Sequence, residues 1–135
     1  MLYLDTETNK MKKIINTIDA PTVIGPYSQA ILSGNTLYCS GLIAINPETG
    51  KLVIDNINAE TKQVMRNILA VLKAAKMNFD NVVKCSIFMK DMNDYAAINE
   101  VYARSFDCNL PAREAVQVSF LPKNVNVEIS VIAVK

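Results

Sequence analysis

The C-terminal segment from Val125 to Val134 (VNVEISVIAV) is the feature that most limits how this chain can fold. Successive side chains of a β-strand point to opposite faces of a sheet. One set of alternate positions is wholly apolar: Val125, Val127, Ile129, Val131 and Ala133. The other set begins polar, at Asn126, Glu128 and Ser130, and ends apolar, at Ile132 and Val134. The segment therefore predicts a strand with one face in a core and one face of mixed character.

Two amphipathic helices are expected to cover the apolar face. In the first, Ala59 to Met77, apolar residues recur at 3.6 spacing, and Asn58 is a candidate N-cap. The second runs from Asp94 to Phe106, with Asn93 as its candidate cap. Four further strands are expected, at Ser28–Ser33, Leu37–Ile45, Val82–Lys90 and Ala115–Phe120. The order strand, strand, helix, strand, helix, strand, strand predicts an α+β domain.

Two helices can cover only one side of such a sheet. The mean hydropathy of the 135 residues is slightly positive, which is high for so short a soluble chain. Exposed Ile132 and Val134 then favour burial of the second face against a neighbouring subunit. A loop folding over that face is the alternative.

Charge and length exclude several classes of protein. The net charge is +1, from 14 basic and 13 acidic residues without a basic run, so nucleic-acid binding has little electrostatic support. No apolar stretch approaches the ~20 residues of a membrane span. Residues 1–10 lack the pattern of a signal peptide and are interpreted as a flexible extension, which leaves residues 11–135 as a single domain.

The chemistry open to the chain is limited by the absence of histidine. Ser-His-Asp and Cys-His catalysis and histidine metal sites are excluded. The three cysteines, Cys39, Cys85 and Cys108, show no metal-binding spacing, so no metal site is expected. Reduced thiols are the default in the cytoplasm, which is the expected location.

Several residues could carry chemistry, and each also has an ordinary structural interpretation. Tyr27 follows a Gly-Pro bend and either closes a pocket or packs at a strand entry. Ser40 and Gly41 interrupt an apolar strand. They either let a ligand approach the backbone closely or leave a simple gap in the packing. Arg113 has the planar fork that clamps a carboxylate, or is a surface arginine. Glu128 lies mid-strand among apolar residues. It either acts as a general base, or it is an ordinary side chain that faces solvent or pairs with a lysine.

Arg113 and Glu128 are not expected to meet within one chain. A tight turn at Pro122-Lys123 would place Glu128 opposite Gln117, leaving Arg113 about 13 Å further along the strand. We therefore expect a site that uses both residues to form between subunits. A wide or bulged turn would invalidate this estimate.

Five ordered segments carry a resemblance to a known family: IGPYSQA (24–30), CSGLIAINPETG (39–50), FMKDMNDYAAINEVYARSF (88–106), PAREAVQV (111–118) and LPKNVNVEISVIAV (121–134). Together they resemble the Rid (YjgF-like) family of reactive-intermediate deaminases, from about Met11 to Lys135. The resemblance implies a chorismate-mutase-like mixed sheet with two helices on one face, and a homotrimer with sites between subunits. It also implies hydrolysis of 2-iminobutanoate and 2-iminopropanoate, the latter derived from 2-aminoacrylate, to 2-oxo acids and ammonia. Such intermediates arise from pyridoxal-phosphate enzymes, and the family needs no cofactor of its own.

The resemblance also assigns roles to individual residues. Arg113 matches the arginine that binds the substrate carboxylate, and Glu128 matches the glutamate that positions or activates water. Four further residues match positions that contact the ligand, and together with Arg113 they would bind the substrate: Tyr27, Ser40, Gly41 and Asn99. The chain departs from many members at Leu42, where glutamine is common, and at Ala115, where some carry cysteine.

Other functions remain open at this point. A non-catalytic trimer that binds a 2-oxo acid or an amino-acid-like ligand and regulates a partner is the main alternative. An RNA-acting translation inhibitor is disfavoured by the near-neutral charge and the lack of histidine. The sequence does not test an oligomeric chaperone.

Overall fold

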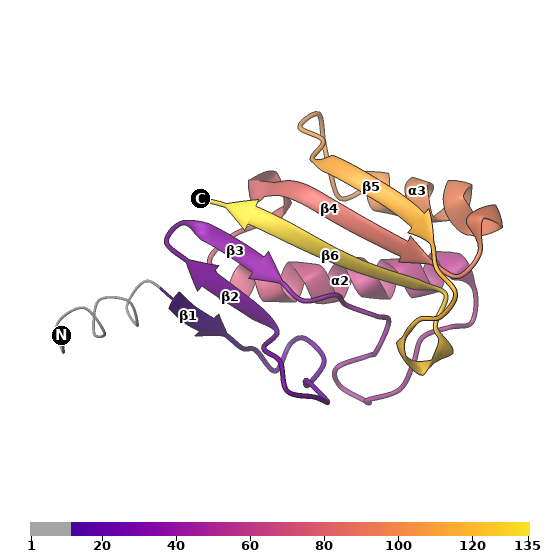
Figure 1. Ribbon diagram of the computed structural model, residues 1–135, viewed down its shortest axis with the longest axis horizontal. Helices are drawn as coiled ribbons and strands as arrows, with labels where there is room; N and C mark the ends of the chain where they lie inside the picture. Colours follow the sequence, from indigo (N-terminus) through magenta and orange to yellow (C-terminus); the bar gives the residue numbers. More distant parts are fainter. Residues whose placement is uncertain (1–11) are drawn as a thin grey trace, which may run out of the picture.

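The C-terminal strand β6 (Val127–Val134) lies inside a six-stranded sheet with the order β1-β2-β3-β6-β4-β5 (Figure 1). The computed structural model describes residues 12–135, so the predicted extension at residues 1–10 lies outside the described residues. The other strands are β1 (Lys12–Ile15), β2 (Ala30–Ser33), β3 (Thr36–Cys39), β4 (Val82–Met89) and β5 (Ala112–Gln117). β6 is antiparallel to both β3 and β4, whereas β5 runs parallel to β4 at the edge.

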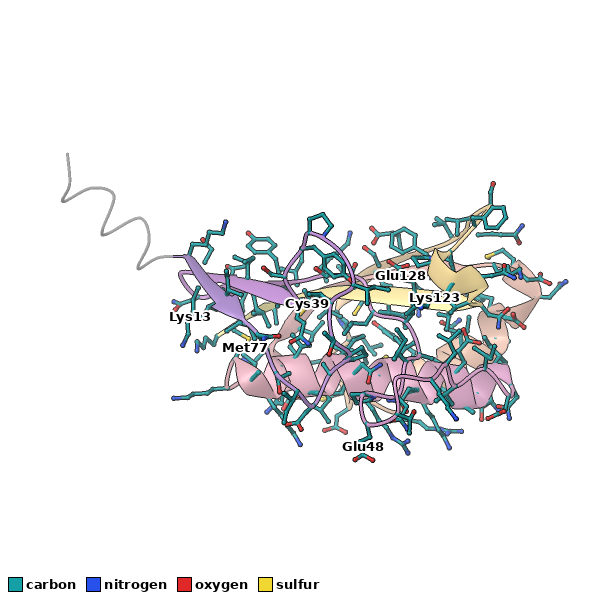
Figure 2. All side chains as sticks on the ribbon, turned by 90° about the horizontal axis from the view of Figure 1, so that it is seen from below. Lys13, Cys39, Glu48, Met77, Lys123 and Glu128 are labelled. Atoms are coloured by element: carbon teal, nitrogen blue, oxygen red, sulfur yellow. The ribbon has the colours of Figure 1, made fainter. Side chains whose placement is uncertain are left out.

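Two helices, α2 (Ile57–Ala74) and α3 (Tyr95–Ala103), pack on the same side of this sheet, and Figure 2 shows α2 beneath it. Three short 3-10 helices complete the described elements: Phe79–Asn81, Met92–Asp94 and Pro122–Asn124. The predicted α+β architecture with helices on one face is confirmed. None of the helices within residues 12–135 combines the length and apolar composition needed to cross a lipid bilayer.

The core lies between β6 and the helices, as the alternation of the last strand predicts. Five apolar residues at alternate positions are at most 2% exposed: Val125, Val127, Ile129, Val131 and Ala133. They meet the α2 stripe of Val64, Ile68, Val71 and Leu72, each fully buried. Burying such side chains stabilises the fold by about 1.5–3 kcal/mol each.

A buried carboxylate joins the first turn of α2 to the start of β6. Glu60 is fully buried, and it accepts hydrogen bonds from the backbone N–H and side-chain amide of Asn126, both at 2.7 Å. The backbone N–H of Val127 donates a third bond at 3.2 Å. A buried charge is tolerated only when it is hydrogen-bonded in this way, so Glu60 fixes the chain where it enters β6.

Four local predictions are wrong in position. The cap of α2 is Asn56, whose side chain accepts a hydrogen bond from the Ala59 N–H, rather than Asn58, because the helix begins at Ile57, two residues before the predicted start at Ala59. Asn93 caps nothing; Asp91 accepts its N–H at the start of the 3-10 turn that leads into α3. The predicted strand Leu37–Ile45 ends at Cys39.

The fourth correction concerns β5, which begins at Ala112 rather than Ala115 and does not form a hairpin with β6. β4 lies between them, and the Pro122–Asn124 helix replaces the tight turn. A parallel partner requires a long crossover connection, and α3 supplies it between β4 and β5. β1 was not predicted; its sequence, KKII, is too short for alternation to be recognised.

The face of the sheet away from the helices carries several apolar side chains in register across the strands. Tyr38 is opposite Ile31 and Ile132, and Ile31 is opposite Ile14. Ile14 is 63% exposed and Tyr38 is 50% exposed. In Figure 2, α2 lies on the opposite side of the sheet from this face.

Candidate active site

Glu128 points away from the core, because its neighbours Val127 and Ile129 point into it. The side chain is half-buried, and this burial raises the pKa of its carboxyl above the ordinary value. No cation of residues 12–135 forms an ion pair with it. The carboxylate is therefore held in a setting that favours its taking up a proton.

Gly41 makes room for this carboxylate. A Cβ atom built on Gly41 would lie 2.9 Å from Glu128 Cδ and closer still to Oε1. Any side chain at position 41 would displace Glu128, so the glycine is required by close approach rather than by a turn. β3 ends at Cys39, two residues before this contact, and pairing with β6 resumes at a bridge between Leu42 and Ile129.

Beside the Glu128 carboxylate, Ser40 is hydrogen-bonded to the segment that leads into β2. Its backbone N–H donates to the Gln29 carbonyl at 3.0 Å, and its hydroxyl donates to the Ser28 carbonyl at 2.6 Å. Within residues 12–135 no hydrogen bond uses the Gly41 N–H. That free donor and the lone pairs of the Ser40 hydroxyl are available to a ligand.

Tyr27 lies on the rim of the same hollow, a cavity of about 420 Å³ with a mainly apolar lining that also includes Ser40, Gly41 and Glu128. Tyr27 is 50% exposed and its backbone N–H donates to the Gly25 carbonyl at 2.9 Å. Gln29 also lines this cavity and was missed by sequence reasoning. It is buried and donates to the Thr17 and Pro21 carbonyls, which holds the 17–21 segment against β2.

Arg113 lies in a second hollow, on the helix side of the edge strand β5. Its Nη1 donates to Asn99 Oδ1 at 2.6 Å and its Nη2 donates to the Tyr95 hydroxyl at 3.0 Å. The guanidinium carbon is 5.0 Å from the centroid of the Tyr102 ring, a cation–π distance. Asn99, Tyr102 and Arg113 line this hollow together with Leu110 and Pro111.

Neutral groups surround the guanidinium of Arg113. Burial raises the pKa of both the Cys85 thiol and the Tyr102 phenol, so neither supplies a negative charge. The Tyr102 hydroxyl has no hydrogen-bond partner among the described residues. The positive charge of Arg113 is therefore left for an anion from outside the chain.

The two hollows are separate within one chain. Arg113 is in register with Cys85, and Glu128 is in register with Phe88, three residues along β4. Two strand spacings and three residues correspond to about 14 Å between their Cα atoms. Cys85 is buried against the helices and Phe88 points the other way, so Arg113 and Glu128 lie on opposite faces. Tyr27, Ser40, Gly41 and Glu128 are brought together, and Arg113 joins Asn99 elsewhere.

Residues 12–135 contain no group of three His, Cys, Asp or Glu side chains placed to hold a metal ion. The charged groups available for chemistry in the two hollows are one carboxylate and one guanidinium.

Comparison with known proteins identifies the family. The model of the family described as Endoribonuclease L-PSP matches residues 17–135, and the chain belongs to this family. A solved structure from Yersinia pestis, described as YyfA, a protein of unknown function of the conserved Rid protein family, has a TM-score of 0.89 and 48% identity over 92% of this chain and 99% of that one. The resemblance to the Rid family and the fold that it implies are thereby confirmed.

Two curated relatives carry different functional descriptions. The 2-iminobutanoate/2-iminopropanoate deaminase of Mus musculus is 45% identical over 125 residues, which cover 93% of each chain. The putative regulator AldR of Lactococcus lactis is 50% identical over 90% of this chain and 96% of the relative. At similar levels of identity, the chain therefore has one relative described as an enzyme and another described as a putative regulator.

Proposed function

We propose that this protein is a 2-iminobutanoate/2-iminopropanoate deaminase, which hydrolyses reactive imino acids to 2-oxo acids and ammonia. The observation that carries the proposal is the Glu128 carboxylate, seated half-buried against the Cα of Gly41 at the edge of a mainly apolar cavity. A base in this position can activate one water molecule next to a small ligand. The 45% identity to a deaminase over nearly the whole chain supports the same reaction.

In the proposed mechanism, Arg113 binds the carboxylate of the imino acid and so orients the imine carbon. Glu128 takes a proton from water while the water oxygen forms a bond to the carbon of the protonated imine and the C=N π pair moves to nitrogen, which gives a neutral tetrahedral carbinolamine. The protonated Glu128 then passes the proton to the amine nitrogen. The C–N bond breaks, ammonia leaves, and the hydroxyl gives its proton to the Glu128 carboxylate, which yields the 2-oxo acid and then releases the proton to solvent.

The remaining predicted residues are assigned to substrate binding. The free Gly41 N–H and the Ser40 hydroxyl would contact the ligand, and Tyr27 would close the cavity rim. Asn99 would act through Arg113, whose Nη1 it already holds. The reaction as written needs no cofactor or metal.

We propose further that the active unit is a homotrimer. Arg113 and Glu128 lie on opposite faces within one chain, so a site that uses both requires a second copy. The apolar side chains on the helix-free face, including Tyr38, Ile14 and Val134, offer a surface for that copy. Light scattering should give a mass near three times the 14.9 kDa of one chain; a monomer would contradict this part of the proposal.

The proposed partners are the small imino acid and, functionally, the pyridoxal-phosphate enzymes that release it. The test couples the protein to a serine/threonine dehydratase and follows formation of the 2-oxo acid above the uncatalysed rate. Wild type should accelerate this step, and Arg113→Ala should lose at least a hundredfold of the acceleration, because the carboxylate is no longer oriented. Glu128→Gln should lower kcat more than it weakens ligand binding.

A regulator that binds a 2-oxo acid or amino-acid-like ligand without catalysis is the second candidate. The 50% identity to the putative regulator AldR favours it. The same coupled assay separates the two: a protein that binds 2-oxobutanoate but does not accelerate imine hydrolysis would be a binding protein.

A further inference from the structure

We propose that Tyr95 is a positioning residue for Arg113: its hydroxyl sets the orientation of the guanidinium plane and thereby the affinity for the substrate carboxylate. This inference rests on the proposed function, because it assumes that Arg113 binds the carboxylate of the ligand.

The geometry places three residues of one helix around one guanidinium. Tyr95 and Asn99 lie one turn apart on α3, so their side chains share a face, and Tyr102 follows on the same face. Asn99 holds Nη1 at 2.6 Å, and Tyr95 holds Nη2 at 3.0 Å. The Tyr102 ring supports the guanidinium from a third direction, at 5.0 Å.

Two hydrogen bonds fix the orientation of the Arg113 guanidinium, which one hydrogen bond would not. A guanidinium held only by Asn99 could rotate about that single hydrogen bond, whereas bonds to both terminal nitrogens fix its plane. Of the five N–H donors of arginine, two are used here, so three remain for a carboxylate. Bidentate binding requires a fixed plane, because both bonds must form together.

The helix that carries Tyr95 is itself firmly anchored. Ile98 is fully buried and Val101 is 4% exposed, both against the core. Tyr95 stands outside that core at 36% exposure, beside the hollow rather than within the packing. The phenol can therefore be altered without removing a core side chain.

Both groups that hold Arg113 are neutral acceptors. The two ion pairs among the described residues, Lys84–Glu114 and Arg104–Glu100, do not involve it. A carboxylate in place of Tyr95 would cancel the charge that the ligand needs, whereas a phenol orients the guanidinium and leaves its charge uncompensated.

This arrangement makes ligand binding sensitive to alkaline pH. Asn99 first, and then the charge of Arg113, lower the pKa of the Tyr95 hydroxyl below its ordinary value of 10.0. Once ionised, the phenolate would compete with the ligand carboxylate for Arg113. The other titratable groups facing Arg113 are Cys85 on β4 and Tyr102 on α3, and burial raises the pKa of both.

The test is Tyr95→Phe, which removes the hydroxyl and keeps the ring. Binding of 2-oxobutanoate is measured by calorimetry, and kcat and KM are measured in the dehydratase-coupled assay. We expect roughly three- to tenfold weaker binding and a similar rise in KM, as for the loss of one hydrogen bond to a charged group, with kcat changed less than twofold. Unchanged affinity and KM would overturn the proposal.

Glu100→Gln is the matched control, because it alters the next residue after Asn99 on α3 and breaks only the exposed pair with Arg104. It should bind 2-oxobutanoate like wild type; an equal loss in both variants would mean that α3 is merely disturbed. The pH profile adds a second criterion. Wild type should lose affinity as Tyr95 ionises, and Tyr95→Phe should not. Identical profiles would overturn the proposal.

The binding measurement separates this inference from the proposed function. If wild type binds 2-oxobutanoate without catalysing imine hydrolysis, the deaminase proposal fails, and weaker binding by Tyr95→Phe still supports the role of Tyr95. If wild type is active and Tyr95→Phe behaves identically, only the positioning role fails. A wild-type protein that neither binds 2-oxobutanoate nor accelerates imine hydrolysis overturns both.

Discussion

The two hollows hold their charged groups by opposite means. Glu128 is held by burial and by contact with Gly41, and its burial disfavours the charged form. Arg113 is held by Asn99 and Tyr95, which stabilise its charge. The hollow around Glu128 contains a base that can take up a proton, and the hollow around Arg113 contains a permanent cation. Neither region could both orient and hydrolyse an imino acid alone, so the proposed reaction requires a second chain to bring Arg113 and Glu128 together.

The largest expected effect comes from mixing two inactive variants. If each site takes Arg113 from one subunit and Glu128 from its neighbour, trimers that combine Arg113→Ala chains with Glu128→Gln chains contain one intact site each. Random assembly at equal amounts should restore about a quarter of the wild-type sites, since about three quarters of the trimers are mixed and one site in three is intact. The coupled assay after co-refolding measures this. Activity no greater than the sum of the separate variants would show that the hollows do not share a site.

Gly41→Ala should break the Glu128 region without unfolding the protein. The added methyl group occupies the position of the carboxylate, so Glu128 must move. A displacement of about 1 Å at a catalytic group can cost roughly a hundredfold in rate. We expect kcat to fall by that order while the melting temperature changes little, because the clash is relieved by movement of the Glu128 side-chain end. Retained activity would mean that the carboxylate works from another position.

Glu60→Ala should show how strongly the Glu128 strand is anchored. The change leaves three donors at Asn126 and Val127 unsatisfied in a buried position, which should cost about 2–4 kcal/mol in the free energy of unfolding. Chemical denaturation measures it. Glu114→Ala on β5 is the control, because Glu114 pairs with Lys84 on an exposed surface. Glu114→Ala should lower the free energy of unfolding much less than Glu60→Ala. Equal losses in the two variants would show that Glu60 anchors its strand no more strongly than the exposed pair anchors β5.

The pKa of Glu128 gives the finest test of the comparison. In one chain, burial raises the pKa of Glu128 above its ordinary value of 4.5. A neighbour's Arg113 would lower it again, so Arg113→Ala should raise the Glu128 pKa relative to wild type. A carboxyl with a raised folded-state pKa stabilises the fold below its unfolded pKa and loses that stability as pH rises through the folded value. The variant should therefore lose stability over a wider pH window above 4.5. Carboxyl NMR titration measures the pKa, and identical values would place the two groups apart.

Sequence patterns predicted the local features of this chain well. The alternation of the last strand identified its buried face, and the 3.6-residue spacing identified α2 and α3. The cap of α2 was placed two residues late because Asn56 and Asn58 are both good capping residues and apolar spacing does not locate the first turn. Asn99 follows from the resemblance alone, and no sequence pattern singles out the hydroxyl of Tyr95 at the start of the same helix.

Strand pairing was the part that the sequence did not reveal. The Leu37–Ile45 segment looks like one strand, yet it ends where Gly41 meets Glu128, a contact between residues 87 positions apart. Gly41 within the apolar run was the available signal. The short connection between β5 and β6 predicts a hairpin, which is wrong because β4 lies between the two strands; the helix α3 between β4 and β5 is the signal for a parallel pair.

By itself, the sequence determined which side chains enter the core and which functional groups exist: no histidine, one mid-strand glutamate and one arginine at a strand start. These follow from local periodicity and residue chemistry, which act over a few positions. Only the tertiary structure decided that β4 separates β5 from β6, so that Arg113 and Glu128 face opposite sides of the sheet. Partner choice in a sheet depends on the burial of whole faces and on how long connections close, and no local pattern records either.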